Sequence, residues 1–134
     1  MPSKTNPKLP LLSAEDKTFV DEETGYTIRQ LTTSPCPNYH LYFTLSGWHQ
    51  NNERLLIVSE RNQGTNLYSL ELISGEMRQL TDYAGHEAIK CFHDSTKNPV
   101  LEEFYYREGE KINSLNLETG EKRVLAKAPQ IGRA

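Results

Sequence analysis

The chain has 134 residues, room for one domain of ordinary size, and its 15 lysines and arginines against 18 acidic residues give a net charge of −3. The basic residues are scattered singly rather than gathered in the stripe that a phosphate backbone requires, so we expect no nucleic-acid partner. No apolar stretch is long enough to span a bilayer or to form a signal-peptide core, so we expect no membrane partner and a cytoplasmic location.

The N-terminal part of the chain predicts an arm followed by a hairpin. Residues 1–17 are expected to be disordered or extended, whereas residues 18–33 carry a turn glycine, Gly25, ahead of a short strand that contains Arg29. No inner strand candidates precede this hairpin. In a ring of repeated sheets such a hairpin closes the last sheet, and its partner strands come from the far end of the ring.

Residues 38–82 predict a four-stranded antiparallel meander. Strands are expected at 40–46, 54–59, 67–72 and 77–80, because apolar residues alternate there and polar turns separate the runs. The last two strands form a hairpin in which Gly75 supplies the positive φ of the turn.

Residues 86–126 repeat this pattern, with the first two strands expected at 87–92 and 99–106, and residues 130–134 are left as a tail. Setting 67–80 over 112–125, at an offset of 45 residues, gives seven identities, among them Gly75 with Gly120. The hairpin at 18–33 is a partial third copy. Copies spaced by 45 to 50 residues have the period of a four-stranded β-propeller blade. The sequence therefore predicts an all-β fold with two full blades (38–82 and 86–126) and a closing hairpin within 18–129, which is an incomplete ring.

Three polar residues are candidates for binding an acidic sugar. His40 and His86 each open an inner strand, and Arg61 lies between the second and third strands, so all three are expected on one face at the mouth of the central channel. Arginine grips carboxylates and histidine adds a donor, which suits a carboxylated sugar. The alternative is that these are solvated loop residues.

The remaining chemistry-bearing residues predict no catalytic or metal site. The four histidines lack the short spacing of a metal pair, and His49 and His93 are expected at the surface in turns. Cys36 and Cys91 predict reduced, structural thiols. Glu102 and Glu103 are adjacent on a strand, point to opposite faces, and are expected at a solvated edge. The aromatic residues that could stack on a sugar, or simply pack, are Trp48, Tyr42 and Phe43.

Three segments resemble the opening blades of the oligogalacturonate lyase family. They are residues 38–43 (NYHLYF), 56–61 (LIVSER) and 66–81, beginning NLYSLEL, and the resemblance extends from about Thr18 to Pro129. The SER and NLY elements also recur in TolB-type propellers, whereas NYHLYF is closer to the lyases. The family resemblance implies a seven-bladed cytoplasmic propeller that cleaves short pectin fragments by β-elimination, with manganese held by histidines and a glutamine.

The family's His-x-His metal pair and catalytic arginine lie in later blades, and this chain has no His-x-His. We therefore expect the N-terminal part of a lyase-like protein, which supplies scaffold and part of the substrate rim, is inactive in isolation and tends to self-associate. Two alternatives stay open: a non-catalytic TolB-like binding or assembly propeller, and a short protein whose copies complete the ring together.

Overall fold

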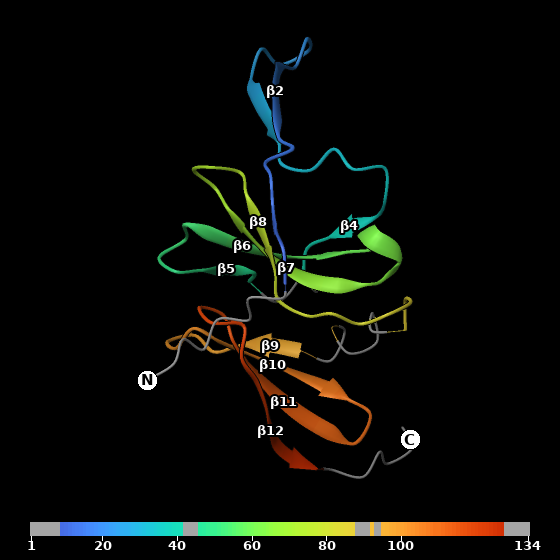
Figure 1. Ribbon diagram of the computed structural model, residues 1–134. Helices are drawn as coiled ribbons and strands as arrows, with labels where there is room; N and C mark the ends of the chain where they lie inside the picture. Colours follow the sequence, from blue (N-terminus) through green and yellow to red (C-terminus); the bar gives the residue numbers. More distant parts are fainter. Residues whose placement is uncertain (1–8, 42–45, 88–91, 93–94, 128–134) are drawn as a thin grey trace, which may run out of the picture.

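The computed structural model describes residues 9–41, 46–87, 92 and 95–127, and it arranges them in three antiparallel sheets (Figure 1). The prediction of an all-β fold made of antiparallel meanders is confirmed. The inner strands expected at 40–46 and 87–92 fall largely on residues outside the described ranges, and so does the tail at 130–134. Within the described ranges, no helix is long and apolar enough to cross a membrane.

The centre of the first blade is formed by the most apolar part of the sequence. Strand β6 (Arg54–Ser59) pairs along its whole length with β7 (Asn66–Glu71), which continues through a turn into β8 (Met77–Gln79). Gly75 in that turn has a φ of 79°, and a Cβ there would come within 2.9 Å of the Ala14 side chain. Both the left-handed backbone and the lack of space therefore require glycine at this position.

Short strands complete the two edges of the first blade. On the inner edge, β4 (Asn38–Tyr39) and β5 (Trp48–His49) pair with opposite ends of β6. On the outer edge, β1 (Leu11–Leu12) pairs with β8. Part of the segment expected as a disordered or extended arm is therefore a strand of this sheet, because the apolar pair in β1 can be placed against its outer edge.

The second blade is a four-stranded meander in the order β12-β11-β10-β9. Its strands are β9 (Ser95–Lys97), β10 (Glu103–Glu108), β11 (Lys111–Asn116) and β12 (Lys122–Lys127). The strand expected from residue 99 begins only at β10, because the Asn98 side chain accepts the backbone N–H groups of both Val100 and Leu101 at 2.8 Å. That asparagine turn replaces strand pairing over these residues.

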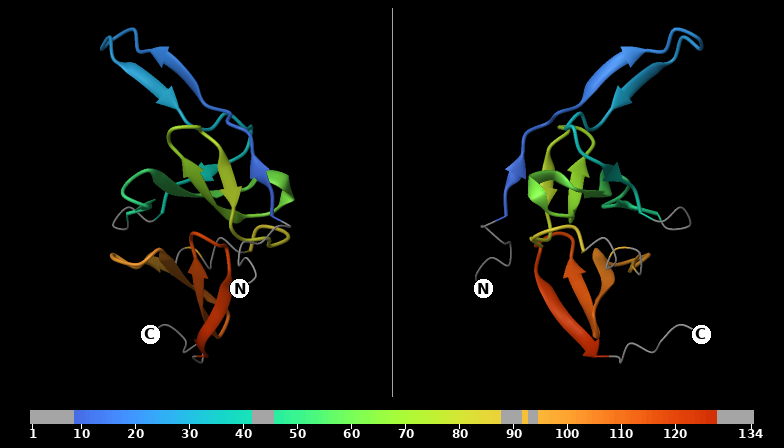
Figure 2. Two further views of the ribbon diagram at one scale, coloured as in Figure 1. Left: turned by 60° about the vertical axis from the view of Figure 1, so that its left-hand side comes forward. Right: turned by 90° about the vertical axis from the view of Figure 1, so that its right-hand side faces the viewer.

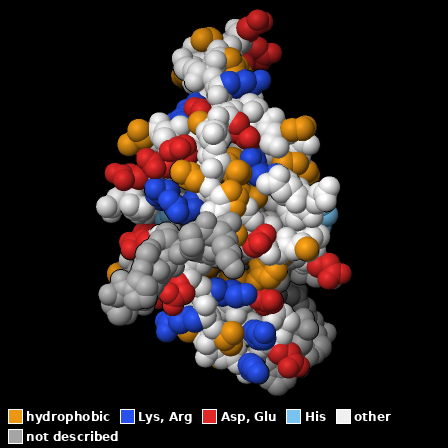
Figure 3. Space-filling view, viewed as in Figure 1, with side chains coloured by type: hydrophobic (Ala, Val, Ile, Leu, Met, Phe, Trp, Pro, Cys, Tyr) orange, Lys and Arg blue, Asp and Glu red, His pale blue; other side chains and the backbone are white. Residues whose placement is uncertain are grey.

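The third sheet is the hairpin of β2 (Lys17–Val20) and β3 (Thr27–Gln30), which projects from the first blade (Figure 2). In the part of the chain that the structure describes, it pairs with no further strand. Its base is fixed by Arg29, which donates to the Asp16 carboxylate at 2.7 Å and to the backbone carbonyl of Leu72. Large apolar side chains remain exposed on it, and hydrophobic atoms are visible at the top of Figure 3.

The main hydrophobic core lies between the two blades. Every second side chain of β6 and β7 points toward the second blade. These side chains pack against phenylalanine, tyrosine and leucine side chains of β10 and β11. Burying each such side chain contributes about 1.5–3 kcal/mol relative to leaving it exposed. The fully buried members from the two blades include Leu56, Leu67, Phe104, Tyr106 and Leu115.

The opposite face of the first blade carries a smaller cluster. Its buried members are Ile57, Tyr68, Leu70 and Met77. Leu12 and Leu31 pack against them, and both belong to residues 9–37, which we call the N-terminal segment. The N-terminal segment thus covers a blade face that a neighbouring blade covers in a closed propeller.

Candidate functional site at the blade rim

The β6–β7 loop of the first blade lies beside the segment that leads into the second blade (Figure 1). The loop contains η1 (Arg61–Gln63). The amide of Thr65 donates to the Gly85 carbonyl at 2.8 Å, and the amide of Gly85 donates to the Gln63 carbonyl at 3.1 Å. A Cβ on Gly64 would lie 2.3 Å from the Tyr83 carbonyl oxygen, so this approach requires glycine.

His86, one of the three candidate sugar-binding residues, contacts polar side chains of the β6–β7 loop. Its Nδ1 lies 2.9 Å from the Thr65 hydroxyl and 3.6 Å from Oε1 of Glu60, and its side chain is about half exposed. The other oxygen of Glu60 accepts the Tyr39 hydroxyl at 2.5 Å, and this hydrogen bond raises the pKa of Tyr39. Tyr39, Glu60 and His86 form what we call the rim group.

His40 is exposed, as predicted, but in the described part of the chain its ring bonds to its own neighbour. Nδ1 lies 2.5 Å from the Leu41 carbonyl oxygen and donates to it. The rim group therefore contains His86 but not His40. It also contains Glu60, which sequence reasoning missed.

Arg61 was expected to be exposed at the rim, and this expectation is wrong because the side chain is buried. Its guanidinium donates to both oxygens of Glu15, at 3.2 and 2.9 Å, and to the Asn38 side chain at 3.1 Å. Nε donates to the Ser59 hydroxyl at 2.9 Å, and the guanidinium carbon lies 5.5 Å from the centre of the Tyr68 ring.

Glu15 is held as an ionised carboxylate beneath the rim. Burial opposes its ionisation, but hydrogen bonds from Arg61 and from the amides of Ser34 and Thr33 outweigh this effect and lower the pKa of Glu15. Arg61, which was expected to bind a ligand carboxylate, thus binds the carboxylate of Glu15, 46 residues away in the chain. No local pattern in the sequence pairs these two residues.

A second polar group lies at the other end of the same interface. His49 is only 3% exposed, although it was expected at the surface. Its Nδ1 lies 2.9 Å from Glu102 of the second blade, and its Nε2 lies 2.9 Å from the hydroxyl of Ser69. Glu102 was expected at a solvated edge. Both expectations are wrong because the second blade packs over the β5–β6 turn and brings the two side chains together.

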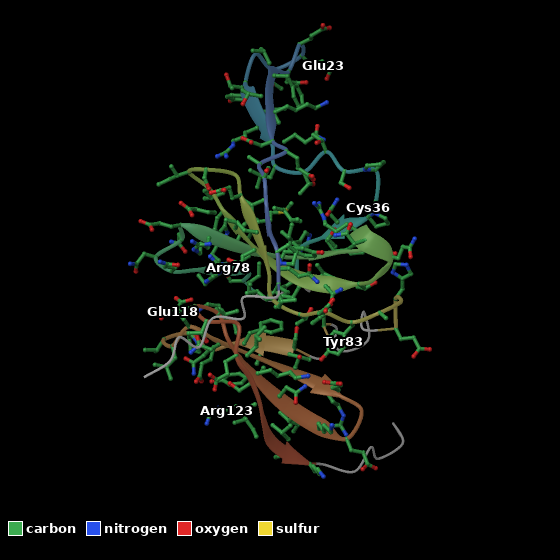
Figure 4. All side chains as sticks on the ribbon, viewed as in Figure 1. Glu23, Cys36, Arg78, Tyr83, Glu118 and Arg123 are labelled. Carbon is green, nitrogen blue, oxygen red and sulfur yellow. The ribbon has the colours of Figure 1, made fainter. Side chains whose placement is uncertain are left out.

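Of the three aromatic residues that could stack on a sugar or simply pack, only Trp48 lies within the described residues, and it is not near the rim group. Trp48 lies in β5, at the opposite end of β6 from Glu60, while Tyr42 and Phe43 lie outside the described residues. His93 and Cys91 lie outside them as well. Cys36, labelled in Figure 4, lies 3.7 Å from the Ser59 hydroxyl.

The described residues do not fit a metal ion. They contain no group of three or more histidine, cysteine, aspartate or glutamate side chains placed to hold one. The nitrogens of His49 are bound to protein partners, and His86 meets a single carboxylate. The rim group instead places the exposed imidazole of His86 beside the carboxylate of Glu60, which also binds the Tyr39 hydroxyl. This arrangement is suited to hydrogen bonding with polar ligands.

No protein-family model and no curated protein matches the chain. Among solved structures, it is similar to an oligogalacturonate lyase from Vibrio parahaemolyticus, with 23% identity and a TM-score of 0.77 over 92% of this chain and 32% of that one. An oligogalacturonate lyase in complex with manganese matches with 22% identity and a TM-score of 0.77 over 91% of this chain and 32% of that one. TolB from Acinetobacter baumannii matches with 14% identity and a TM-score of 0.56 over 92% and 31%.

These similarities show the fold. The two sheets are successive blades of the kind found in these propellers, and the open arrangement of the sheets confirms the prediction of an incomplete ring. The chain spans about a third of the length of the solved structures it matches.

Proposed function

We propose that this chain forms the N-terminal blades of an oligogalacturonate lyase-like β-propeller, in which it supplies scaffold and part of the rim that binds the acidic sugar. The observation that carries the proposal is the difference between the two kinds of structural match. The lyases superpose with a TM-score of 0.77, whereas TolB, covered to the same extent, reaches 0.56. The family resemblance of residues 38–43 points the same way.

The roles that we assign to the three candidate residues follow from the positions of their side chains. His40 and His86 are exposed, and they are the side chains that we assign to contact with the sugar. Arg61 is already engaged by Glu15, so we assign it to holding the β6–β7 loop in place beneath the sugar. Elimination next to a uronate carboxylate needs a cation and a base, which belong to blades beyond this chain.

The second candidate is a non-catalytic binding or assembly propeller like TolB. Its support is the TolB match, which extends over 92% of the chain. Oligogalacturonate binding has no place in this alternative.

A chimera separates the two candidates. The third of the Vibrio parahaemolyticus lyase that this chain matches is replaced by this chain, and release of unsaturated uronate from digalacturonate is followed by ultraviolet absorbance with manganese present. A lyase-like origin predicts a folded chimera that turns over substrate, because the blades that supply the cation and the base are unchanged. The control chimera carries instead the part of TolB that this chain matches, and it is expected to be inactive. A chimera that folds and binds manganese but neither binds nor cleaves digalacturonate would reject the proposal in favour of the TolB-like module.

A further inference from the structure

The group formed by His49, Ser69 and Glu102 has a feature that the proposed function does not use. It is a buried histidine that bridges the two blades, with one partner in each. Ser69 belongs to β7 of the first blade, and Glu102 precedes β10 of the second. A serine beside a histidine is also the arrangement of a catalytic nucleophile and its base. Because the Ser69 side chain is buried, no substrate can reach its hydroxyl, and we assign it no catalytic role.

The contacts decide where the protons lie. Both oxygens of Glu102 are used as acceptors, one by the Gln50 amide at 2.8 Å and the other by the His49 ring at 2.9 Å. Nδ1 of His49 therefore carries the proton that it donates to Glu102. Nε2 is then the acceptor of the Ser69 hydroxyl, and every polar position of the ring is satisfied while the ring is neutral.

A second proton would have to enter at Nε2, on the side of Ser69. The new N–H could donate to the serine oxygen, but the hydroxyl hydrogen of Ser69 would then lose its acceptor inside a central strand. A positive charge would also enter a buried site that has one carboxylate. Losing a satisfied buried hydrogen bond and gaining a buried charge both favour opening of the interface.

We propose that His49, Ser69 and Glu102 form a latch between the two blades that is closed while His49 is neutral and opens when it is protonated. The latch lies beside Arg54, at one end of β6, while the rim group follows the other end of that strand. The interface is therefore held at both ends by a histidine and a glutamate, and of these two histidines only His49 is buried.

The charges around the ring support this assignment. Burial lowers the pKa of His49, and this effect outweighs the attraction of Glu102, while Lys97 and Arg54 lower it further. Arg54 is itself paired with Glu71 at 3.1 Å. The unfolded chain takes up its proton near the ordinary value of 6.5, before the folded chain does. Stability from the latch is thus present above that pH and is lost as the pH falls below it.

The test uses the full chain in two measurements, which do not depend on the proposed lyase role. The first is an NMR titration of the histidine rings, in which the ring whose signal is missing from His49→Gln is expected to titrate below the ordinary value of 6.5. The second is hydrogen exchange of the Gln50 amide, whose acceptor is Glu102. Its protection factor is expected to be lower at about pH 5 than at about pH 7, because the unfolded chain binds the His49 proton before the folded chain does.

Glutamine at position 49 keeps one donor and one acceptor but cannot be protonated. His49→Gln is therefore expected to remove the pH dependence of Gln50 protection, while the matched variant of the exposed histidine, His86→Gln, is expected to retain it. If His49→Gln does not fold, Ser69→Ala replaces it, and freeing Nε2 is then expected to raise the pKa of the His49 ring. A His49 ring that titrates at or above 6.5 in the native chain, or equal pH dependence in His49→Gln and the native chain, would overturn the proposal.

Discussion

Replacing Glu15 with alanine tests how strongly the N-terminal segment is tied to the first blade. The carboxylate accepts two hydrogen bonds from Arg61, and it also accepts the amides of Thr33 and Ser34 at 3.0 and 3.1 Å. Alanine leaves a buried guanidinium without its counter-ion and two amides without an acceptor. Each of these losses destabilises the folded state but leaves the unfolded state unchanged.

The magnitude follows from the degree of burial. Removing one partner of a fully buried ion pair costs about 3–5 kcal/mol, and exposed pairs contribute about 0–1 kcal/mol. The Arg61 side chain is 7% exposed and the Glu15 side chain 21% exposed, which places this pair nearer the buried limit. We expect Glu15→Ala to lower the free energy of unfolding by about 2–3 kcal/mol, and Glu15→Gln, which keeps one acceptor oxygen, by about 1–2 kcal/mol.

The assay is urea unfolding followed by tyrosine and tryptophan fluorescence, with Glu23→Ala at the tip of the hairpin (Figure 4) as the matched control. That exposed change is expected to stay within about 0.5 kcal/mol of the native chain. Because the pKa of Glu15 is lowered from 4.5, its contribution is present above that pH and is lost as the pH falls through the folded-state pKa. Equal stability of Glu15→Ala and Glu23→Ala at neutral pH would refute the reasoning.

Three further outcomes are expected. The chain in isolation should release no unsaturated uronate from digalacturonate with or without manganese, and robust turnover would show that a base and metal site were overlooked. Light scattering should detect self-association driven by exposed Phe19 and Ile28, and Phe19→Lys with Ile28→Lys should reduce it, whereas a strictly monomeric native chain would contradict this. Gly75→Ala should lower the thermal midpoint, with a cost of at least about 1 kcal/mol from the left-handed backbone and the crowding by Asp16, while the exposed Gly25→Ala should cost less.

The repeat carried most of the information about the fold. Residues 67–80 and 112–125 share their turn glycine and alternating leucines, so hairpin formation and strand order could be read locally. Both hairpins are present with their glycines at φ of 79° and 78°. Such features are predictable because a turn and a pleat depend on residues that are close together in the chain.

The rim was predicted only in part. Blade geometry placed the loops around Arg61 and His86 on one face, and the backbone bonds between Thr65 and Gly85 agree with that placement. Sequence reasoning missed Glu60, whose acidic side chain faces the loop of the next blade. It also assumed that a loop arginine is exposed.

By itself, the sequence determined a meander of strands with a period of about 45 residues, because alternation and turn chemistry act over short distances. Only the tertiary structure decided which charged side chains are buried. Arg61 meets a carboxylate 46 residues away, and His49 meets one 53 residues away, each brought within 3 Å by sheets that pack across the chain. Burial of a charge is stable only when a partner arrives to satisfy it, and the identity of that partner is fixed by the packing of the blades.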